Sequence, residues 1–561
     1  MRLLSKTNLS HIIFILIITL ALVLRFYNIS NVPPSASLDE ASIGYNAYSI
    51  LQTGADEYGN RFPVLLRAYD DWRPSLYVYL VIPFIKLFGL DVLSVRLPSV
   101  ILSLLTVIAT YLLTKELFKK SNIKFEICLP RLFTKQIFRG NLKFEISEVA
   151  MLLLAISPWH IYISRLGHEV NTGLSFFIFA LLFFFKDKIF FSLTFFTLSF
   201  MSYQSEKIFI PLFVLTLFFL YWNKLLTHKK ELFFSSIFCL IITIPFIQAT
   251  LSPQALVRFK ATNAFTSQDE RFIEKSKILA RAVEENDLIS MIVNNRRMVY
   301  SQIFLEGYFS HLNPNWLFSN FSEDRHKVPG LGLFYPWEAI FIVVGLILLI
   351  FQKFDYRIKL IIIAWSAFSI IPAAVTTDSP HAMRAFTVLP APQIISALGL
   401  MHLLSFVKQK RKIIPVLFFS ILILSSITYF WKQYFDIFPK TQSSSFQYSL
   451  AQVIKYAINN ENSYDRVVFA NKDNLYQSYM FFLFNSRYDP NKYQNLGGTI
   501  SGGYNESHKI GKFEFRPIDW DKELRDNNTL YIGNVDEFGT DANIVNRFYE
   551  LNGKETINAV N

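Results

Sequence analysis

The sequence is poor in cysteine, with only Cys128 and Cys239 in 561 residues. Two thiols are too few for a disulfide framework or a thiolate metal site. Cys239 lies inside an apolar run, which favours a small core residue. Charged residues are also scarce, at 17% of the chain, whereas 52% of the residues are apolar and 57 are phenylalanine. This balance excludes an ordinary soluble protein.

The sequence contains repeated long apolar runs, which are unusual in a soluble protein. Runs of about 17 to 24 apolar residues match the length with which a helix crosses a bilayer, so we expect a polytopic α-helical membrane protein. The first run, His11–Tyr27, lacks a small-x-small cleavage site and predicts a retained anchor. The net charge of +12 is expected on cytoplasmic loops near anionic membrane lipid, and no nucleic acid partner is expected.

Lysine and arginine predict the orientation of the chain. Arg2 and Lys6 precede the first run, which places the N-terminus in the cytoplasm. The short segment Pro74–Gly89 is interrupted by Pro83 and Lys86, and we expect an interfacial helix there because only then does the basic loop 119–143 lie inside. About eleven spans result, near 11–27, 95–118, 148–164, 172–186, 188–203, 207–224, 232–250, 336–352, 358–376, 384–406 and 412–430.

These spans predict two domains. A membrane-embedded domain covers residues 1–430, with a first outer loop at 28–94 and a long outer segment at 251–335. Residues 431–561 lack a run of spanning length and predict a small C-terminal extracytoplasmic α/β domain. The chain has no internal repeat. Within the C-terminal domain we expect an amphipathic helix near 444–459, buried strands at 465–470 and 529–534, and a helix near 474–484.

Five polar clusters fall on the predicted outer side. Charged groups at a helical bundle are costly and are usually functional. Five clusters on one face indicate a cleft at the membrane surface, with acids for proton transfer or metal binding and cations for an anionic group. The clusters are "LDE" (38–40), "AYDDWRPSLY" (68–77), "SRLGHEVN" (164–171), "SYQSEK" (202–207) and "TTDSPHAMR" (376–384).

Structural interpretations stay open for the acids of the first two clusters. Ser37 or Asp39 could be the N-cap of a short helix, whose first turn favours negative charge. Glu40 could only compensate the helix dipole, and Asp70–Asp71 could be a solvated loop.

The other three clusters have structural alternatives as well. Arg165 and Glu169 could form an i,i+4 pair, and Lys207 could extend to the membrane surface. His381 and Arg384 stand three residues apart at an expected helix start, where a cation is unfavourable next to the dipole. This spacing favours a functional role for them.

Through these motifs the chain resembles the bacterial family 39 glycosyltransferases. That family is related to the protein O-mannosyltransferases and to the aminoarabinose transferase for lipid A, and it has the membrane-embedded GT-C fold. The match covers about residues 8 to 405. It consists of the acidic "DE" after the first span, "TGADEYGNRFPVLLRAYDDWRPSLYVYL", "RLPSVILSLLTVIATYLLTKELF", "SPWHIYISRLGHEVN", "SYQSEKIFIPL" and "DSPHAMR", in that order.

The resemblance implies an inverting glycosyltransferase of the plasma (inner) membrane with its active site outside. Its donor would be a polyprenyl-phosphate-linked sugar, and its acceptor a hydroxyl of a protein, lipid or glycan. Asp39 would be the general base and Glu40 a second catalytic acid. Cations would surround the donor phosphate, and Tyr203 and three charged residues would form a supporting or acceptor side. The phosphate-binding residues would be Arg73, Arg384, Lys207 and His381, and the supporting residues Asp71, Arg165, Glu169 and Tyr203.

Two departures from the family pattern concern this site. Relatives often read K-P-P-L, whereas Arg73 here begins R-P-S-L and offers a bidentate fork. Trp72 separates Asp71 from Arg73, so the acid that directly precedes the family's lysine has no direct counterpart. No cofactor is assigned, although Asp39, Asp71, His168 and Glu169 could form a hard-ligand site for a divalent cation.

Two rival functions explain the sequence less well than a transferase does. A transporter or flippase of lipid-linked saccharides predicts polar residues at mid-membrane and inverted repeats with broken helices, and the sequence has neither. A non-catalytic scaffold does not explain five polar clusters on one face. The sequence names neither the sugar nor the acceptor class.

Overall fold

The computed structural model describes residues 8–69, 71–119, 126–128, 143–253, 255–256, 263–265, 270–319, 326–407, 413–500, 502–503 and 506–561. They divide into two compact units. The helical unit contains Met1–Ala21, Leu105–His160 and Gly173–Ser426, and the mixed unit contains Leu22–Leu104, Ile161–Thr172 and Ile427–Asn561. Asp70 and most of the predicted basic loop 119–143 lie outside the described residues.

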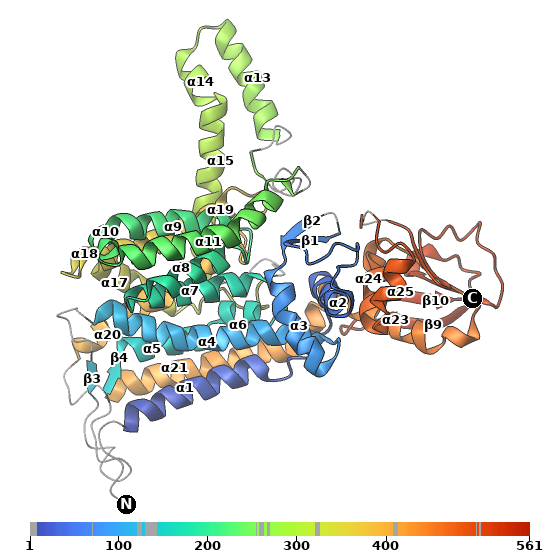
Figure 1. Ribbon diagram of the computed structural model, residues 1–561, viewed down its shortest axis with the longest axis horizontal. Helices are drawn as coiled ribbons and strands as arrows, with labels where there is room; N and C mark the ends of the chain where they lie inside the picture. Colours follow the sequence, from blue (N-terminus) through green and yellow to red (C-terminus); the bar gives the residue numbers. More distant parts are fainter. Residues whose placement is uncertain are drawn as a thin grey trace, which may run out of the picture. The chain divides into compact units, whose positions relative to one another are not determined.

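Apolar helices build the helical unit, and α7, α8, α9 and α11 run beside one another in it (Figure 1). Phenylalanine fills the space between these helices: the Phe177 ring lies 4.9 Å from Phe209 and 5.0 Å from Phe213. The described helices of this unit, including those that continue into the mixed unit, are α1 (Asn8–Phe26), α4 (Val92–Phe118), α5 (Ile146–Ile156), α6 (Pro158–Ser164), α7 (Val170–Phe185), α8 (Ile189–Phe200), α9 (Glu206–Leu220), α10 (Trp222–Thr227), α11 (Lys229–Thr250), α13 (Glu270–Glu284), α14 (Leu288–Val293), α15 (Arg296–Ser310), α16 (Pro314–Phe318), α17 (Glu338–Phe351), α18 (Tyr356–Phe368), α19 (Ile371–Ala374), η1 (Phe386–Val388), α20 (Ala391–Ser405) and α21 (Ile413–Trp431).

Two glycines bring α17 and α20 into close contact. A Cβ on Gly345 would lie 1.9 Å from the carbonyl oxygen of Ile395, and one on Gly399 would lie 2.0 Å from that of Phe341. Only glycine allows the backbones to approach this closely.

Each predicted span coincides with a helix or with a broken helix. By length and composition, five of the described helices can cross a membrane, or six if α5 and α6 together form one span. These two meet at an angle of 57° where one straight span over 148–164 was expected. Pro158 explains the break, because proline has no N–H to continue the helical ladder. Five further apolar helices are shorter, so about eleven spans stays a prediction.

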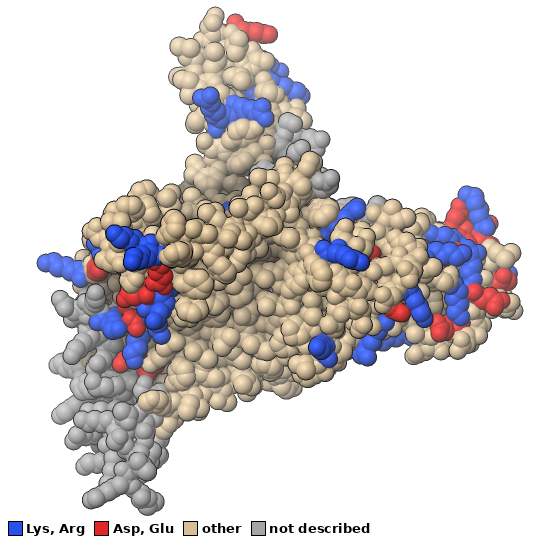
Figure 2. Space-filling model, viewed as in Figure 1, with Lys and Arg blue, Asp and Glu red and all other residues tan. Residues whose placement is uncertain are grey.

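Exposed apolar side chains cover the long helices. Phe233, Phe234 and Ile241 on α11 and Phe418 and Ile421 on α21 are each more than half exposed. On the face drawn in Figure 2, few charged side chains lie over α9 and α11, and more gather near α10 and α18. Such a surface is unfavourable in water and suits a hydrocarbon environment.

The mixed unit begins with α2 (Leu38–Thr53), a hairpin of β1 (Leu65–Ala68) and β2 (Asp71–Pro74), and α3 (Leu76–Phe88). Ser37 is the N-cap of α2, because its side chain accepts the Glu40 N–H while the Glu40 carboxylate accepts the Ser37 N–H. The N-cap interpretation is therefore confirmed for Ser37, whereas Asp39 lies within the first turn. Gly54 ends α2 at φ +74°, a left-handed conformation that favours glycine. The interfacial placement of α3 stays a prediction.

The C-terminal part of the mixed unit is a sheet with helices, which confirms the predicted α/β class. Its strand order is β6-β7-β5-β8-β10-β9; β5 is parallel to both neighbours and the other pairs are antiparallel. The predicted strands appear as β5 (Arg466–Phe469) and β8 (Thr529–Asn534), and the predicted helices as α23 (Tyr448–Asn459) and α24 (Ser478–Ser486). The further α-helices and strands of this part are α22 (Phe438–Thr441), α25 (Pro490–Asn495), β6 (His508–Ile510), β7 (Phe513–Phe515), β9 (Ile544–Tyr549) and β10 (Glu555–Val560).

One hydrophobic core joins the first outer loop to this sheet domain. It includes Ile43 and Ala47 of α2, Phe481 and Phe484 of α24, and Val468 of β5, all of them buried. The compact unit thus unites segments from both ends of the sequence. The division of the chain at residue 430 and the extracytoplasmic placement of 431–561 stay predictions.

Candidate functional site

The two acids at the start of α2 lie in different environments. The Glu40 side chain is 1% exposed and the Asp39 side chain is 45% exposed. Asp39 is therefore the acid that can meet a substrate from solution, and Glu40 is part of the protein interior.

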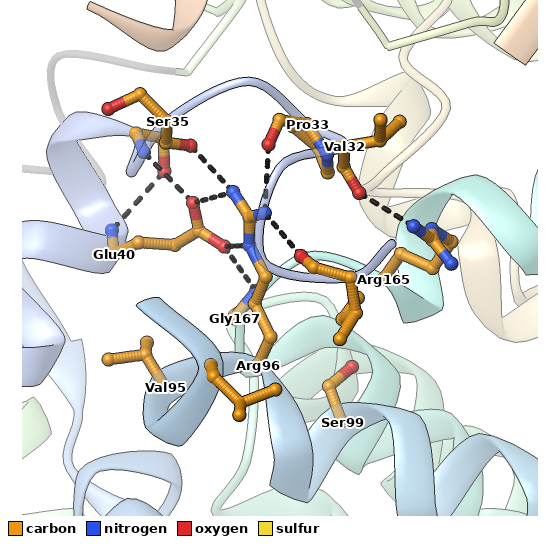
Figure 3. Close-up of polar contacts among 12 residues, drawn as sticks. Val32, Pro33, Ser35, Glu40, Val95, Arg96, Ser99, Arg165 and Gly167 are labelled. Carbon is orange, nitrogen blue, oxygen red and sulfur yellow. Dashed lines mark hydrogen bonds and ion pairs between the residues drawn. The ribbon is translucent and has the colours of Figure 1, made fainter. Parts of the chain in front are cut away.

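Arg96 of α4 holds Glu40 with a two-pronged ion pair (Figure 3). Its Nε lies 2.7 Å from Glu40 Oε1 and its Nη2 lies 3.0 Å from Oε2, while the Gly167 N–H donates to Oε1 at 2.8 Å. Burial opposes ionisation of Glu40, but Arg96 and the N–H groups of Gly167 and Ser37 outweigh it and lower the pKa of Glu40. Glu40 is thus a charged anchor of α2, and its predicted catalytic role stays a prediction.

Arg96 also fixes the chain that leads into α2. It donates to the carbonyl oxygens of Ile29, Pro33 and Ser35 at 2.8, 2.9 and 2.6 Å. Sequence reasoning gave this residue no role. The signal was present, because an arginine inside a predicted apolar span requires a partner.

The exposed acid Asp39 pairs with a buried arginine. Asp39 Oδ1 lies 2.6 Å from Nη2 of Arg73, whose side chain is 4% exposed. Burial disfavours the charged guanidinium, but Asp39, then Glu169 and Asp71, outweigh burial and raise the pKa of Arg73. Arg73 Nε and Nη1 have no hydrogen-bond partner among the residues that the structure describes.

His168 and Glu169 complete the group around Asp39. His168 Nε2 lies 3.9 Å from Asp39 Oδ2, and its Nδ1 accepts the Val170 N–H at 3.2 Å. Glu169 is buried, with Oε2 at 3.5 Å from His168 Nδ1. We call Asp39, Arg73, His168 and Glu169 the acid–arginine cluster.

Asp71 and Tyr69 border this cluster. Asp71 Oδ1 accepts the Trp72 N–H at 2.7 Å, so Asp71 turns to its own strand while still contributing negative charge near Arg73. Tyr69 donates its hydroxyl proton to the Leu38 carbonyl at 2.8 Å and thereby ties the hairpin to the start of α2.

Arg165 does not form the i,i+4 pair with Glu169 that the spacing allows. Its guanidinium donates to the carbonyls of Leu24, Arg25, Tyr27 and Val32 at 2.7 to 3.2 Å. Carbonyls at the end of a helix lack intrahelical partners, and Arg165 supplies donors for the end of α1. A role of Arg165 on the acceptor side stays a prediction.

The remaining predicted site residues lie in the helical unit. Lys207 lies over the Phe246 ring at 4.9 Å and donates to Thr250 Oγ1 at 3.4 Å. Tyr203 is buried in the turn between α8 and α9. The convergence of all five polar clusters in one cleft stays a prediction.

His381 and Arg384 belong to a basic group in the same unit. The His381 N–H donates to His311 Nε2 at 3.0 Å, the His326 and His381 rings are 4.5 Å apart, and Arg384 lies 3.8 Å from Asp378. Burial lowers the pKa of His311 to about 4, with Arg384 adding to the effect, so this imidazole is neutral at pH 7. Arg384 supplies a positive charge and the histidine rings supply hydrogen-bonding groups, a combination suited to an anionic group.

The suggested divalent-cation site would combine Asp39, Asp71, His168 and Glu169. Within the described ranges, no group of three or more His, Cys, Asp or Glu side chains is placed to hold a metal ion. The donor set around Asp39 includes Arg73, whose positive charge opposes a cation there.

Solved structures with a similar fold include ArnT and an archaeal oligosaccharyltransferase. ArnT from Cupriavidus metallidurans matches in the apo state with a TM-score of 0.54 and 11% identity over 97% of each chain. The same protein bound to undecaprenyl phosphate matches with a TM-score of 0.55 and 12% identity over 99% of this chain and 98% of that one. The apo Archaeoglobus fulgidus oligosaccharyltransferase matches with a TM-score of 0.50 and 13% identity over 86% of this chain and 64% of that one.

Sequence comparison adds no relative: no family model and no curated protein matches the chain. The structural likeness nevertheless extends from end to end in ArnT. The chain therefore has the predicted GT-C fold and is a polytopic membrane protein.

Proposed function

We propose that the protein is a membrane glycosyltransferase that moves a sugar from a polyprenyl-phosphate donor to an acceptor hydroxyl on the extracytoplasmic face. The observation that carries the proposal is the exposed Asp39 at the start of α2, which forms an ion pair with the buried Arg73 of β2. The GT-C fold, shared over nearly the full length of ArnT, supports it. One structure of that protein contains undecaprenyl phosphate, which is the lipid product of such a transfer.

In the proposed reaction Asp39 is the general base. Arg73 orients the carboxylate through Oδ1, and the ionised Asp39 accepts the proton of the acceptor hydroxyl in this step. The acceptor oxygen attacks the anomeric carbon as the bond from that carbon to the phosphate oxygen breaks. The bonding electron pair leaves with the polyprenyl phosphate, and the anomeric configuration inverts.

Cations offset the charge that develops on the leaving phosphate. Arg73 is our first candidate, because its Nε and Nη1 make no hydrogen bond among the described residues. Lys207, His381 and Arg384 are further candidates. Cations fixed before the reaction stabilise developing charge without a reorganisation cost.

The test is sugar transfer by purified protein supplied with labelled polyprenyl-phosphate sugars. We expect release of polyprenyl phosphate by the wild type, and a loss of at least about 100-fold in Asp39→Asn, because general base catalysis contributes roughly 10²- to 10⁴-fold. Asp521→Asn, an exposed acid of the sheet domain, is the matched control and should stay active. Wild-type-like turnover in Asp39→Asn would exclude Asp39 as the base, and absence of any lipid phosphate release would contradict the transferase.

A further inference from the structure

Glu57 is a buried carboxylate that the proposed reaction does not use. It lies in the loop after α2 and is 1% exposed. Asn46 of α2 donates to its Oε1 at 2.9 Å, and the Asn46 side-chain oxygen accepts the Glu57 N–H at 2.9 Å. Glu57 is thus bound to the helix that carries Asp39.

The other carboxylate oxygen of Glu57 is held by the sheet domain. Thr499 donates its hydroxyl to Oε2 at 2.7 Å and Tyr479 of α24 donates to the same oxygen at 3.2 Å. The Thr499 N–H also donates to the Glu57 carbonyl at 3.2 Å. Three side-chain donors therefore converge on one buried acid from two distant parts of the sequence.

A second polar contact runs parallel to the first. The Gln494 amide of α25 donates to Ser49 Oγ and Thr53 Oγ1 of α2, each at 3.0 Å, and to the Asp56 carbonyl at 3.0 Å. One amide nitrogen is shared among several acceptors, which fixes the last two turns of α2 against α25. Arg96 and Gly167 fix the first turn, as described above.

Apolar packing alone would join these elements without the carboxylate. A buried carboxyl group is costly unless it is hydrogen-bonded, and replacing it and its partners by apolar groups of the same shape can be nearly neutral or stabilising. Glu57 is hydrogen-bonded from both α2 and the sheet domain. This arrangement indicates that Glu57 fixes the orientation of α2 on the sheet domain. Asp39 is on the same helix, and small displacements of a catalytic group have large effects on rate.

We infer that Glu57, Thr499 and Tyr479 form a positioning joint through which the C-terminal sheet domain sets the orientation of α2 and of the proposed base Asp39. The inference rests on the proposed function for its catalytic consequence. The joint itself concerns only how firmly α2 is held, and this can be tested without measuring turnover.

Two substitutions at Thr499 separate the hydrogen bond from the shape. Thr499→Val keeps the shape and removes the donor, whereas Thr499→Ser keeps the donor. We expect Thr499→Val to lower kcat about tenfold with KM for the polyprenyl-phosphate sugar unchanged, and Thr499→Ser to recover most of the loss. Thr540→Val, at an exposed threonine of the same domain, is the control and should behave as wild type.

Amide hydrogen exchange of residues 38–53 in the full-length purified protein is the second readout. We expect faster exchange in α2 for Thr499→Val and Glu57→Gln than for wild type and Thr499→Ser. Exchange at the wild-type rate in both variants, or an unchanged kcat, would overturn the joint. If wild-type protein transfers no sugar, the proposed function fails, and the exchange comparison alone then supports or overturns the joint.

Discussion

Burial separates residues that look alike in the sequence. Asp39 and Glu40 are neighbours, yet one faces solvent beside Arg73 and the other is enclosed by Arg96 and Gly167. Glu57, also an acid of the first outer loop, is enclosed by hydroxyl and amide donors, and no described residue forms an ion pair with it. The three carboxylates therefore have different chemistry.

The pKa of Glu57 leads to a prediction about pH. Burial raises it from 4.5 to about 7, against opposing hydrogen bonds, with the neighbouring acid Asp56 adding to the rise. Because the folded state then binds the proton more tightly than the unfolded state, the free energy of unfolding should fall as pH rises from about 4.5 to about 7 and stay level above. The full effect is on the order of 3 kcal/mol.

Melting temperatures of wild type and Glu57→Gln between pH 5 and pH 8 would measure this effect. Asp56, Tyr45, Tyr479 and Tyr493 also surround Glu57, but they are present in both proteins and largely cancel in the difference. The variant should gain stability relative to wild type as pH rises. Two parallel profiles would contradict the raised pKa.

At the scale of elements, α2 is fixed from several directions. Arg96 of α4 and the turn at Gly167 hold its first residues, while α24 and α25 pack along its length. Gly44 permits the close contact with α24, since a Cβ there would lie 2.5 Å from the Phe484 ring. The position of the helix that carries Asp39 is thus fixed by tertiary contacts at its first turn and along its length.

The Arg96–Glu40 pair should contribute strongly to stability. Arg96→Leu leaves Glu40 charged and buried without its partner, which costs about 3–5 kcal/mol and should lower the melting temperature in detergent. The double variant Glu40→Leu with Arg96→Leu removes both charges and should recover part of the loss. Recovery should be incomplete, because Arg96 also serves the carbonyls of Ile29, Pro33 and Ser35.

A double-mutant cycle on Glu40 and Arg96, measured by thermal unfolding, gives the interaction energy between the two residues. Asp521→Leu, at an exposed acid of the sheet domain, serves as the control. Additive effects of the two single substitutions would show that the pair does not act as a unit.

At the scale of the whole molecule, the compact units do not follow the order of the chain. The first outer loop shares a core with residues 427–561, and several long helices run through both units. The sheet domain is therefore a partner of the loop that bears Asp39 and Arg73. Its apolar surface on α24 is buried by α2, including Phe484 against Gly44.

Residues 442–561 expressed alone should consequently fail to form a stable monomer. Loss of α2 exposes the apolar face of α24 and unpairs Glu57's donors Thr499 and Tyr479. We expect aggregation or a non-cooperative melt by circular dichroism, and improvement when residues 28–94 are fused to the fragment. A soluble monomer with a sharp melting transition would contradict the shared core.

The sequence alone determined the class of the protein and much of its element list. Apolar runs predicted the helices because only helices of that length satisfy backbone polar groups in hydrocarbon. Periodicity and β-rich stretches similarly located α23, β5 and β8. The ordered motifs pointed to the GT-C fold and to Asp39 and Arg73, which the structure brings to 2.6 Å.

Only the tertiary structure decided the environment of each charge. Several charged and polar groups have partners far away in the sequence, namely Arg96, Gly167, Glu57 and Thr499. No local sequence pattern identifies partners that are so far apart along the chain. The Arg165–Glu169 pair that the spacing allows does not form among the described residues for the same reason, because the carbonyls at the end of α1 bind the guanidinium. Burial and partner choice are properties of packing, and packing separates the exposed acid from the enclosed ones.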